Sequence, residues 1–146
     1  MPPAKKKVDV KPAPAPAEKK QTERPKGQES AKSPQGKASM QKVNQARGQL
    51  ERGRTDSAIR TLEGAVRIDA RNGEAYILLA RAWKQKGEKR KALEFAKKAE
   101  LLYQKQPAKL KEVYLLESDL YRELGDDTKA ATLRQKASGV RQKPSE

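Results

Sequence analysis

The chain has 146 residues and a formal net charge of +15, and it contains neither cysteine nor histidine. The length allows one ordinary domain, and the missing residue types exclude disulfides, thiolate nucleophiles, imidazole bases and the usual zinc ligands. The positive charge predicts solubility and attraction to acidic partners, without choosing among acidic proteins, nucleic acids and anionic lipid.

The first 38 residues are predicted to be a disordered basic tail. Residues 1–39 hold seven of the nine prolines and ten Lys or Arg against four acidic residues, and they offer few sizeable apolar side chains. Such a segment buries too little apolar surface to offset the entropy lost on ordering it. The run from Lys11 to Ala17, in which proline and alanine alternate, predicts an extended spacer. The folded body is therefore predicted at residues 39–140, with a second disordered tail at 141–146.

From Met40 onward the sequence predicts helices. Apolar side chains recur three and four residues apart in five stretches, and a weaker sixth pattern runs from about Thr128 to Ala137. The stretches are separated by residues that end helices or favour turns, namely Gly53, Asn72-Gly73, Gly87, Pro107 and Gly125. No alternating run of β-branched residues predicts a strand. The pattern indicates an all-α fold of six helices, each of about 12–15 residues.

Small residues return at a fixed offset along this body. A shift of 34 positions carries Ala46 to Ala80, Gly53 to Gly87, Ala58 to Ala92 and Ala65 to Ala99. A further shift of 38 positions carries these to Ser118, Gly125, Ala130 and Ala137. The four additional residues are placed in the connection at 104–111. Such self-similarity predicts three helix–turn–helix repeats whose small residues lie where helices approach closely.

The repeat resembles the tetratricopeptide family. The middle unit reads Tyr76-x2-Leu79-Ala80-x2-Trp83, then Ala92-x3-Ala96-x2-Ala99, and the outer units match less completely. The resemblance implies a right-handed superhelix with repeats at about 39–72, 73–106 and 111–140. It also implies a non-enzymatic adaptor that binds a peptide or helix of another protein in a concave groove.

The same resemblance places the groove on the first helix of each repeat. Its arginines and lysine would pair with carboxylates and its aliphatic side chains would anchor apolar residues, which suits an acidic partner with apolar anchors. The expected groove residues are Val43, Arg47, Leu50, Ile77, Arg81, Lys84, Leu115 and Arg122. Val43 and Arg47 stand where chaperone-binding members of the family carry Lys and Asn, which disfavours chaperone docking.

Two other functions stay open. No separate polar helix follows Ala137 to cover the end of the array, which allows a homodimer or larger assembly through the terminal repeats. The basic tail allows weak binding of nucleic acid or an anionic surface. Basic residues also surround Trp83 between Arg81 and Lys91, but the repeat assigns that indole to packing, which disfavours nucleic acid as a partner of the body.

Nothing in the sequence predicts catalysis, a cofactor or a metal site. Asp119 and Glu123 share a helix face, but the pattern predicts no concave, partly desolvated setting for them, and surface ion pairing explains them. No apolar run is long enough to span a membrane. The Pro/Ala/Lys-rich spacer ahead of a short repeat body resembles the layout of bacterial envelope proteins whose signal or lipid anchor has been removed. That layout favours the periplasm or envelope over the cytoplasm.

Overall fold

The structure, a computed structural model, describes residues 33–141. This part of the chain contains six helices and no strand: α3 (Pro34–Glu51), α4 (Thr55–Ile68), α5 (Gly73–Gln85), α6 (Lys89–Leu102), α7 (Pro107–Glu123) and α8 (Asp127–Gly139). The predicted all-α class is confirmed. The predictions for the tails at residues 1–32 and 142–146 lie outside the described residues.

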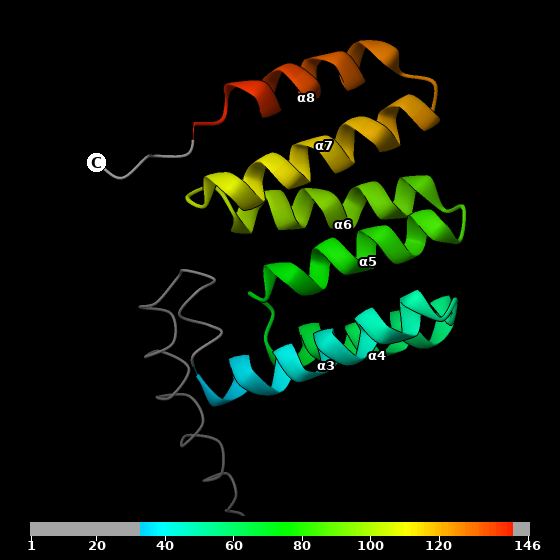
Figure 1. Cartoon of the computed structure of the whole chain (residues 1–146), viewed down its shortest axis with the longest axis vertical. Coiled ribbons are helices and arrows are strands. Elements are labelled where there is room, and N and C mark those ends of the chain that lie inside the picture. Colours follow the sequence, from blue (N-terminus) through cyan, green and yellow to red (C-terminus); the bar gives the residue numbers. More distant parts are fainter. Residues whose placement is uncertain (1–32, 142–146) are drawn as a thin grey trace, which may run out of the picture.

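The helices form three antiparallel hairpins that stack in chain order. The pairs α3–α4, α5–α6 and α7–α8 pack as hairpins, and α4–α5 and α6–α7 join one hairpin to the next. Figure 1 shows them following one another along the longest axis, with α3 and α4 at one end and α8 at the other. Helices α3 and α5 also touch directly, so the first helices of the first two hairpins are neighbours.

The turn inside each hairpin has the same hydrogen bonds. Gly53, Gly87 and Gly125 adopt φ values of 77°, 87° and 88°, a left-handed conformation that costs glycine little. At the first turn Gly53 N donates to Leu50 O and Arg54 N donates to Gln49 O, and equivalent pairs recur at the other two. This is the Schellman arrangement, which ends a helix by satisfying its last carbonyl groups. The three glycines predicted as breakers therefore fix three equivalent corners.

The folded body begins earlier than residue 39. Helix α3 starts at Pro34, and the Ser33 hydroxyl caps it by accepting a hydrogen bond of 2.9 Å from Gly36 N. Ser39 is buried and its hydroxyl donates to Ala65 O of α4 at 2.8 Å. The predicted boundary was wrong because proline is well tolerated in the first turn of a helix, and small residues pack closely without adding hydrophobicity.

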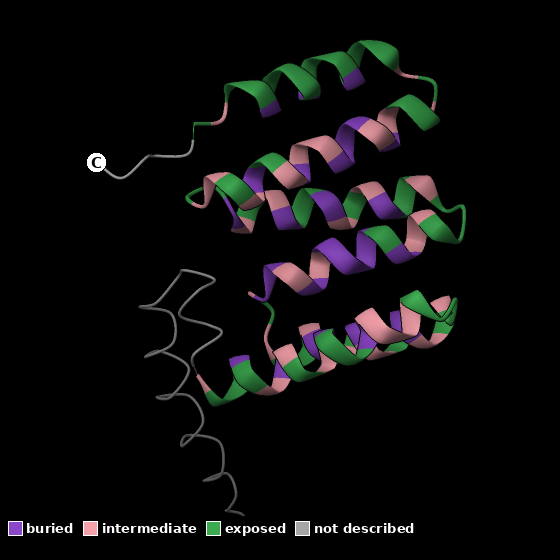
Figure 2. Cartoon of the chain, in the orientation of Figure 1, coloured by how far each residue is buried: buried purple, intermediate pink, exposed green. Residues whose placement is uncertain are grey.

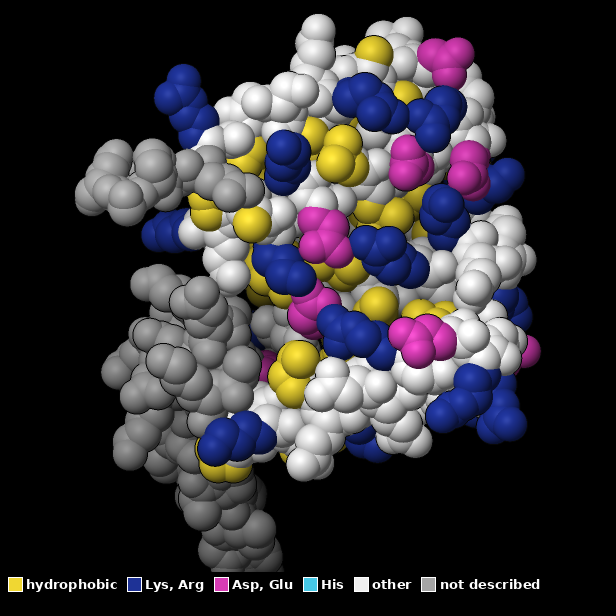
Figure 3. Space-filling model, in the orientation of Figure 1, with side chains coloured by type: hydrophobic (Ala, Val, Ile, Leu, Met, Phe, Trp, Pro, Cys, Tyr) yellow, Lys and Arg dark blue, Asp and Glu magenta, His cyan; other side chains and the backbone are white. Residues whose placement is uncertain are grey.

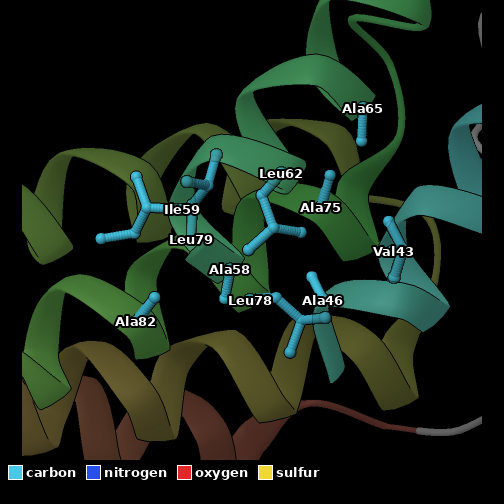
Figure 4. Packing of buried hydrophobic residues seen from close by; sticks show 10 residues of the cluster. All are labelled: Val43, Ala46, Ala58, Ile59, Leu62, Ala65, Ala75, Leu78, Leu79 and Ala82. Carbon is cyan, nitrogen blue, oxygen red and sulfur yellow. The ribbon is translucent and has the colours of Figure 1, made fainter. Parts of the chain in front are cut away.

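The repeated small residues form the contacts between helices, as predicted. Ala46, Ala80 and Ser118 are fully buried, as are Ala58 and Ala92, and Ala130 is nearly so. Ala46 and Ala58 belong to a hydrophobic cluster among α3, α4 and α5, and Ala80 and Ala92 belong to a second cluster among α5, α6 and α7. Figure 4 shows the first cluster, with Leu62, Leu79 and Val43 directed into one interior.

Aromatic side chains of the middle hairpin link the two clusters. Tyr76, Trp83 and Phe95 are partly buried and pack against both of them. The rings of Tyr76 and Phe95 stack with their centroids 6.4 Å apart. Aromatic side chains of the middle repeat therefore fill the space between neighbouring repeats, and Trp83 has the packing role predicted for it.

The four additional residues of the third repeat lengthen a helix. Helix α7 has 17 residues whereas α5 has 13, and only Tyr103–Gln106 connect α6 to α7. We predicted these residues in the connection at 104–111, but Pro107 begins α7, so they form an additional turn of helix. The short connection holds Tyr103 over the start of α5, where burial raises the pKa of its hydroxyl above the usual range.

Candidate functional site

Two adjoining hollows lie on the face formed by the first helices α3, α5 and α7. The larger has a volume of about 490 Å³ and is lined by Leu50, Glu51, Arg81, Lys84, Gln85, Leu116, Asp119 and Glu123. The smaller has a volume of about 380 Å³ and is lined by Arg81, Ala108, Lys111, Glu112, Leu115, Leu116 and Asp119. Since the two share Arg81, Leu116 and Asp119, they form one groove, which we call the first-helix groove.

An ion pair repeats along this face in phase with the fold. Arg47 of α3 lies 2.9 Å from Glu74 of α5, and Arg81 of α5 lies 2.9 Å from Glu112 of α7. The arginines are 34 residues apart and the acids 38 apart, the offsets of the repeat itself. Each arginine therefore reaches forward to the N-terminal half of the next first helix. Figure 3 shows basic and acidic side chains alternating where α5 and α7 lie, with hydrophobic side chains between them.

Glu74 joins all three first helices. Its carboxylate accepts hydrogen bonds from Arg47 of α3 and Lys109 of α7, and Lys109 also lies 3.6 Å from Glu112. Burial alone would lower the pKa of the Lys109 ammonium, but the hydrogen bond and charge of Glu74, together with Glu112, raise it above the usual range. The Glu74 side chain is only 14% exposed, so water screens these contacts less than those of a surface pair.

Further ion pairs lie along the groove. Lys84 of α5 lies 3.3 Å from Glu123 of α7, and Arg122 lies 3.0 Å from Asp119 one helical turn away. Arg134 of α8 approaches the same Asp119 carboxylate at 3.9 Å. Asp119 thus serves in surface ion pairs, and among residues 33–141 no group of three or more Asp or Glu side chains could hold a metal ion.

The structure brings together four of the eight predicted groove residues. Leu50, Arg81, Lys84 and Leu115 line the hollows. Arg47 and Arg122 make the ion pairs described above but line neither hollow.

Val43 and Ile77 were wrongly assigned to the groove. Val43 is 0% exposed in the first cluster and Ile77 is 1% exposed in the second. Both occupy one register of the repeat, and Leu115 follows in the third unit. Val43 and Ile77 each pack against the hairpin that follows. Leu115 is half-buried and lines a hollow, because the described residues contain no further hairpin to cover it.

The predicted set leaves out Leu116, Ala108 and Lys111, which also line the hollows. Leu116 is buried in the second cluster and also lines both hollows. Its helical spacing in the sequence indicates the core position but not the contact with the groove. Ala108 and Lys111 line the smaller hollow from the first turns of α7. Pro107, an allowed first residue of a helix, was the one signal for that additional turn.

The basic segment around Trp83 serves packing. The indole lies against both hydrophobic clusters, while Lys91 and Lys86 approach its ring at 4.5 and 5.6 Å from the centroid. Lys86 also pairs with Asp56 at 2.8 Å. The ring is therefore held inside the fold and is not presented as a stacking platform for a nucleic-acid base.

Comparison with known proteins then identifies the repeat. A family model described as "Tetratricopeptide repeat" matches residues 49–114. Residues 49–114 are tetratricopeptide repeats. This fold is generally a module for protein–protein interaction. A search of curated proteins gave no match.

Solved structures share the tetratricopeptide fold over most of their length. The globular C-terminal domain of P. aeruginosa LpoP is 27% identical, with a TM-score of 0.66 over 68% of this chain and 94% of that domain. The tetratricopeptide domain of Arabidopsis FLU is 18% identical, with a TM-score of 0.65 over 72% of this chain and 95% of that one. The N-terminal domain of stress-induced protein-1 (STI-1) from C. elegans is 11% identical, with a TM-score of 0.70 over 77% of this chain and 91% of that one. These likenesses confirm the helical repeat solenoid.

Within the described residues, no helix is both long enough and apolar enough to cross a bilayer.

Proposed function

We propose that this protein is a non-enzymatic adaptor whose first-helix groove binds a peptide or helix of a partner protein. The observation that carries the proposal is the continuous groove over α5 and α7, with leucine side chains in both of its hollows. Apolar hollows bordered by fixed charges favour a partner segment with spaced anchor residues. The general role of tetratricopeptide repeats in protein binding supports the same conclusion.

The charges of the groove favour a partner of mixed charge rather than a purely acidic one. Arg81 and Lys84 are paired with Glu112 and Glu123, so a carboxylate of the partner has to displace an acid of this chain. An apolar anchor meets no such competition at Leu50, Leu115 and Leu116. We therefore expect aliphatic anchor residues of the partner to supply most of the affinity. Flanking charges of the partner, of both signs, would replace one member of each ion pair of the groove.

Peptide selection on the full chain tests the proposal, followed by fluorescence anisotropy with the selected peptides. The double variant Arg81→Glu/Lys84→Glu places like charges beside Glu112 and Glu123 and should weaken binding about tenfold or more. The matched control Arg90→Glu/Lys105→Glu changes the net charge equally at exposed positions outside the groove and should bind as the wild type does. Equal losses in both variants, or no loss in either, would reject the groove.

Self-assembly through the terminal repeats finds less support. The outer surface of α8 is exposed and carries mainly polar or basic side chains, with buried positions only on its inner side, as Figure 2 shows. Among the described residues, Ile68 and the 74% exposed Leu101 are the only exposed large hydrophobic side chains. Stable homodimers bury far more apolar surface than two such residues provide. Light scattering over a range of concentrations should give a monomeric mass.

For location, we keep the periplasm or envelope as the proposal. It is supported by the composition of the N-terminal segment and by the likeness to a domain of a bacterial protein, P. aeruginosa LpoP. Fractionation of the producing cells, with detection by a specific antibody, should find the protein outside the cytosol. Recovery in the cytosolic fraction alone would contradict the proposal.

A further inference from the structure

A third cavity lies between the second helices α6 and α8, with α7 beneath. Its volume is about 270 Å³, and it is lined by Lys97, Glu100, Glu117, Tyr121, Lys129, Thr132, Leu133 and Lys136. It shares no lining residue with the first-helix groove. We call it the lysine pocket.

The three lysines of this pocket are exposed and have aromatic rings as neighbours. Lys97 and Lys129 lie over the Tyr121 ring, at 5.6 and 5.4 Å from its centroid, and Lys136 lies over the Tyr114 ring at 5.7 Å. Within residues 33–141 none of the three ammonium groups has a carboxylate oxygen within 4.0 Å, whereas Lys84, in the groove, does. Since no carboxylate of these residues makes an ion pair with them, the three ammonium groups remain available to pair with a bound anion.

Glu117 lines the pocket and stands at a position where the middle repeat has a leucine. Its register is that of Leu79, a core residue of the middle repeat, and Glu117 itself is only 2% exposed. Its Oε2 atom has no hydrogen-bond partner among the described residues. Burying a carboxyl group without satisfying it costs free energy, so a leucine here would serve the fold better.

Burial keeps this carboxyl group protonated at neutral pH. Burial, together with the hydrogen bond and charge of the adjacent Glu100, raises the pKa of Glu117 to about 8, against the lowering effect of Lys97 and Lys136. A protonated carboxyl is a hydrogen-bond donor. With Glu117 neutral, the pocket holds three positive charges and the single negative charge of Glu100, which favours an anion over a cation.

We propose that the lysine pocket binds a dianionic tetrahedral oxyanion, the phosphoryl or sulfuryl group of a small ligand. Three ammonium groups, the Tyr121 hydroxyl and the Glu117 carboxyl offer more donors than the two oxygens of a carboxylate can accept, whereas the Thr132 hydroxyl already donates to Thr128 O. A phosphoryl or sulfuryl group presents at least three oxygens, and its two negative charges match the excess of lysines over Glu100. The volume lies below the usual range for drug-sized ligands, which suits a small anionic group.

Titration of the full chain with inorganic sulfate and phosphate at constant ionic strength, followed by amide chemical shifts, tests the site. Saturable shifts should be confined to α6, α7 and α8. The variant Lys97→Gln/Lys136→Gln should bind either anion at least about tenfold more weakly, since each substitution removes a charge-assisted hydrogen bond to the anion. The matched control Lys91→Gln/Lys98→Gln removes the same charge from α6 outside the pocket and should keep wild-type affinity. Equal weakening in both variants, or shifts without saturation, would overturn the proposal.

Sulfate also tests the part assigned to Glu117, because sulfate remains a dianion throughout the range of the experiment. Wild-type affinity should fall as the pH rises from 7 to 9, since ionisation of Glu117 removes a donor and adds a negative charge. Glu117→Gln keeps an N–H donor that does not titrate, so its affinity should not change over this range. A wild-type affinity independent of pH would remove Glu117 from the site.

A final comparison distinguishes a lipid headgroup from a soluble ligand. Vesicles of phosphatidylcholine with phosphatidic acid present the same phosphomonoester at a surface. Retention on them that is lost in Lys97→Gln/Lys136→Gln identifies the headgroup, whereas anion binding without such retention identifies a soluble ligand. Failure to bind either inorganic anion or vesicles rejects the site, and leaves the proposal for the first-helix groove unaffected because no residue is shared.

Discussion

Gly73 is predicted to be the glycine of the described chain that is least tolerant of a side chain. A Cβ atom built at Gly73 would lie 2.5 Å from Cζ and 2.6 Å from Cε2 of Tyr103. The ring cannot simply turn away, because Tyr103 is buried within the second hydrophobic cluster and closes the short connection between α6 and α7. Gly73→Ala therefore requires the ring or the start of α5 to move by about 1 Å before an ordinary contact distance is restored.

The expected cost is that of overpacking a core, about 1–3 kcal/mol. For a domain of this size, each kcal/mol lowers Tm by roughly 4–8 °C. Thermal and urea unfolding of the full chain, followed by far-UV circular dichroism, would measure the change. Combining the substitution with Tyr103→Leu should cost less than the sum of the single changes, since removing the ring makes room for the added methyl group.

Gly48 provides the matched control for the same chemical change. It lies inside α3 with a normal helical conformation, and an added Cβ would come no closer than 3.7 Å to Arg52 Nη1. Gly48→Ala should therefore stabilise the protein by about 0.5–1 kcal/mol, through helix propensity alone. If Gly73→Ala proved as stable as the wild type while Gly48→Ala behaved as expected, the contact with Tyr103 would not be the constraint inferred here.

Three further predictions concern buried charge and close packing. Between about pH 4.5 and 8 the folded state keeps a proton on Glu117 that the unfolded chain releases, so the free energy of unfolding should fall as the pH rises. Urea titrations at several pH values would measure this dependence. Glu117→Leu should remove the contribution of Glu117 to it and raise Tm at pH 8. Glu74→Gln leaves Arg47 without a carboxylate and Lys109 with Glu112 alone, and it should cost about 1–2 kcal/mol in the same assay, whereas Asp56→Asn at an exposed pair should leave Tm unchanged. Ala92→Leu should cost about 1–3 kcal/mol by overpacking, and a Tm equal to that of the wild type would contradict the assignment of this position to the helix contact.

The elements of this fold that sequence could predict are those set by local stereochemistry. Gly53, Gly87 and Gly125 occupy left-handed positions that other residues adopt at a cost, and Ala46 and Ala80 occupy sites with no room for a larger side chain. Such constraints act on single positions, so they return visibly at the repeat offset. The start of α3 was missed because Pro34 and its small neighbours satisfy a helix without producing an apolar pattern.

The groove was harder to predict because tertiary packing decides the exposure of each side chain. Helical spacing puts Val43, Ile77 and Leu115 on one face, but only the neighbouring hairpin decides which of them is covered. The pairing of Arg47 with Glu74 likewise joins residues 27 positions apart, and no local signal indicates it. Glu117 is the converse case: its departure from the repeat pattern was visible in the sequence, but its burial and its lysine neighbours were not.

The three aromatic residues shared by both clusters determine how the array should come apart. Loss of the first hairpin removes one cluster and leaves the other intact, and loss of the third hairpin does the reverse. Opening the middle hairpin withdraws Tyr76, Trp83 and Phe95 from both clusters at once, so no state with only its ends folded can persist. Fraying should therefore proceed inward from either end, and amide hydrogens of α5 should exchange with solvent more slowly than those of α8.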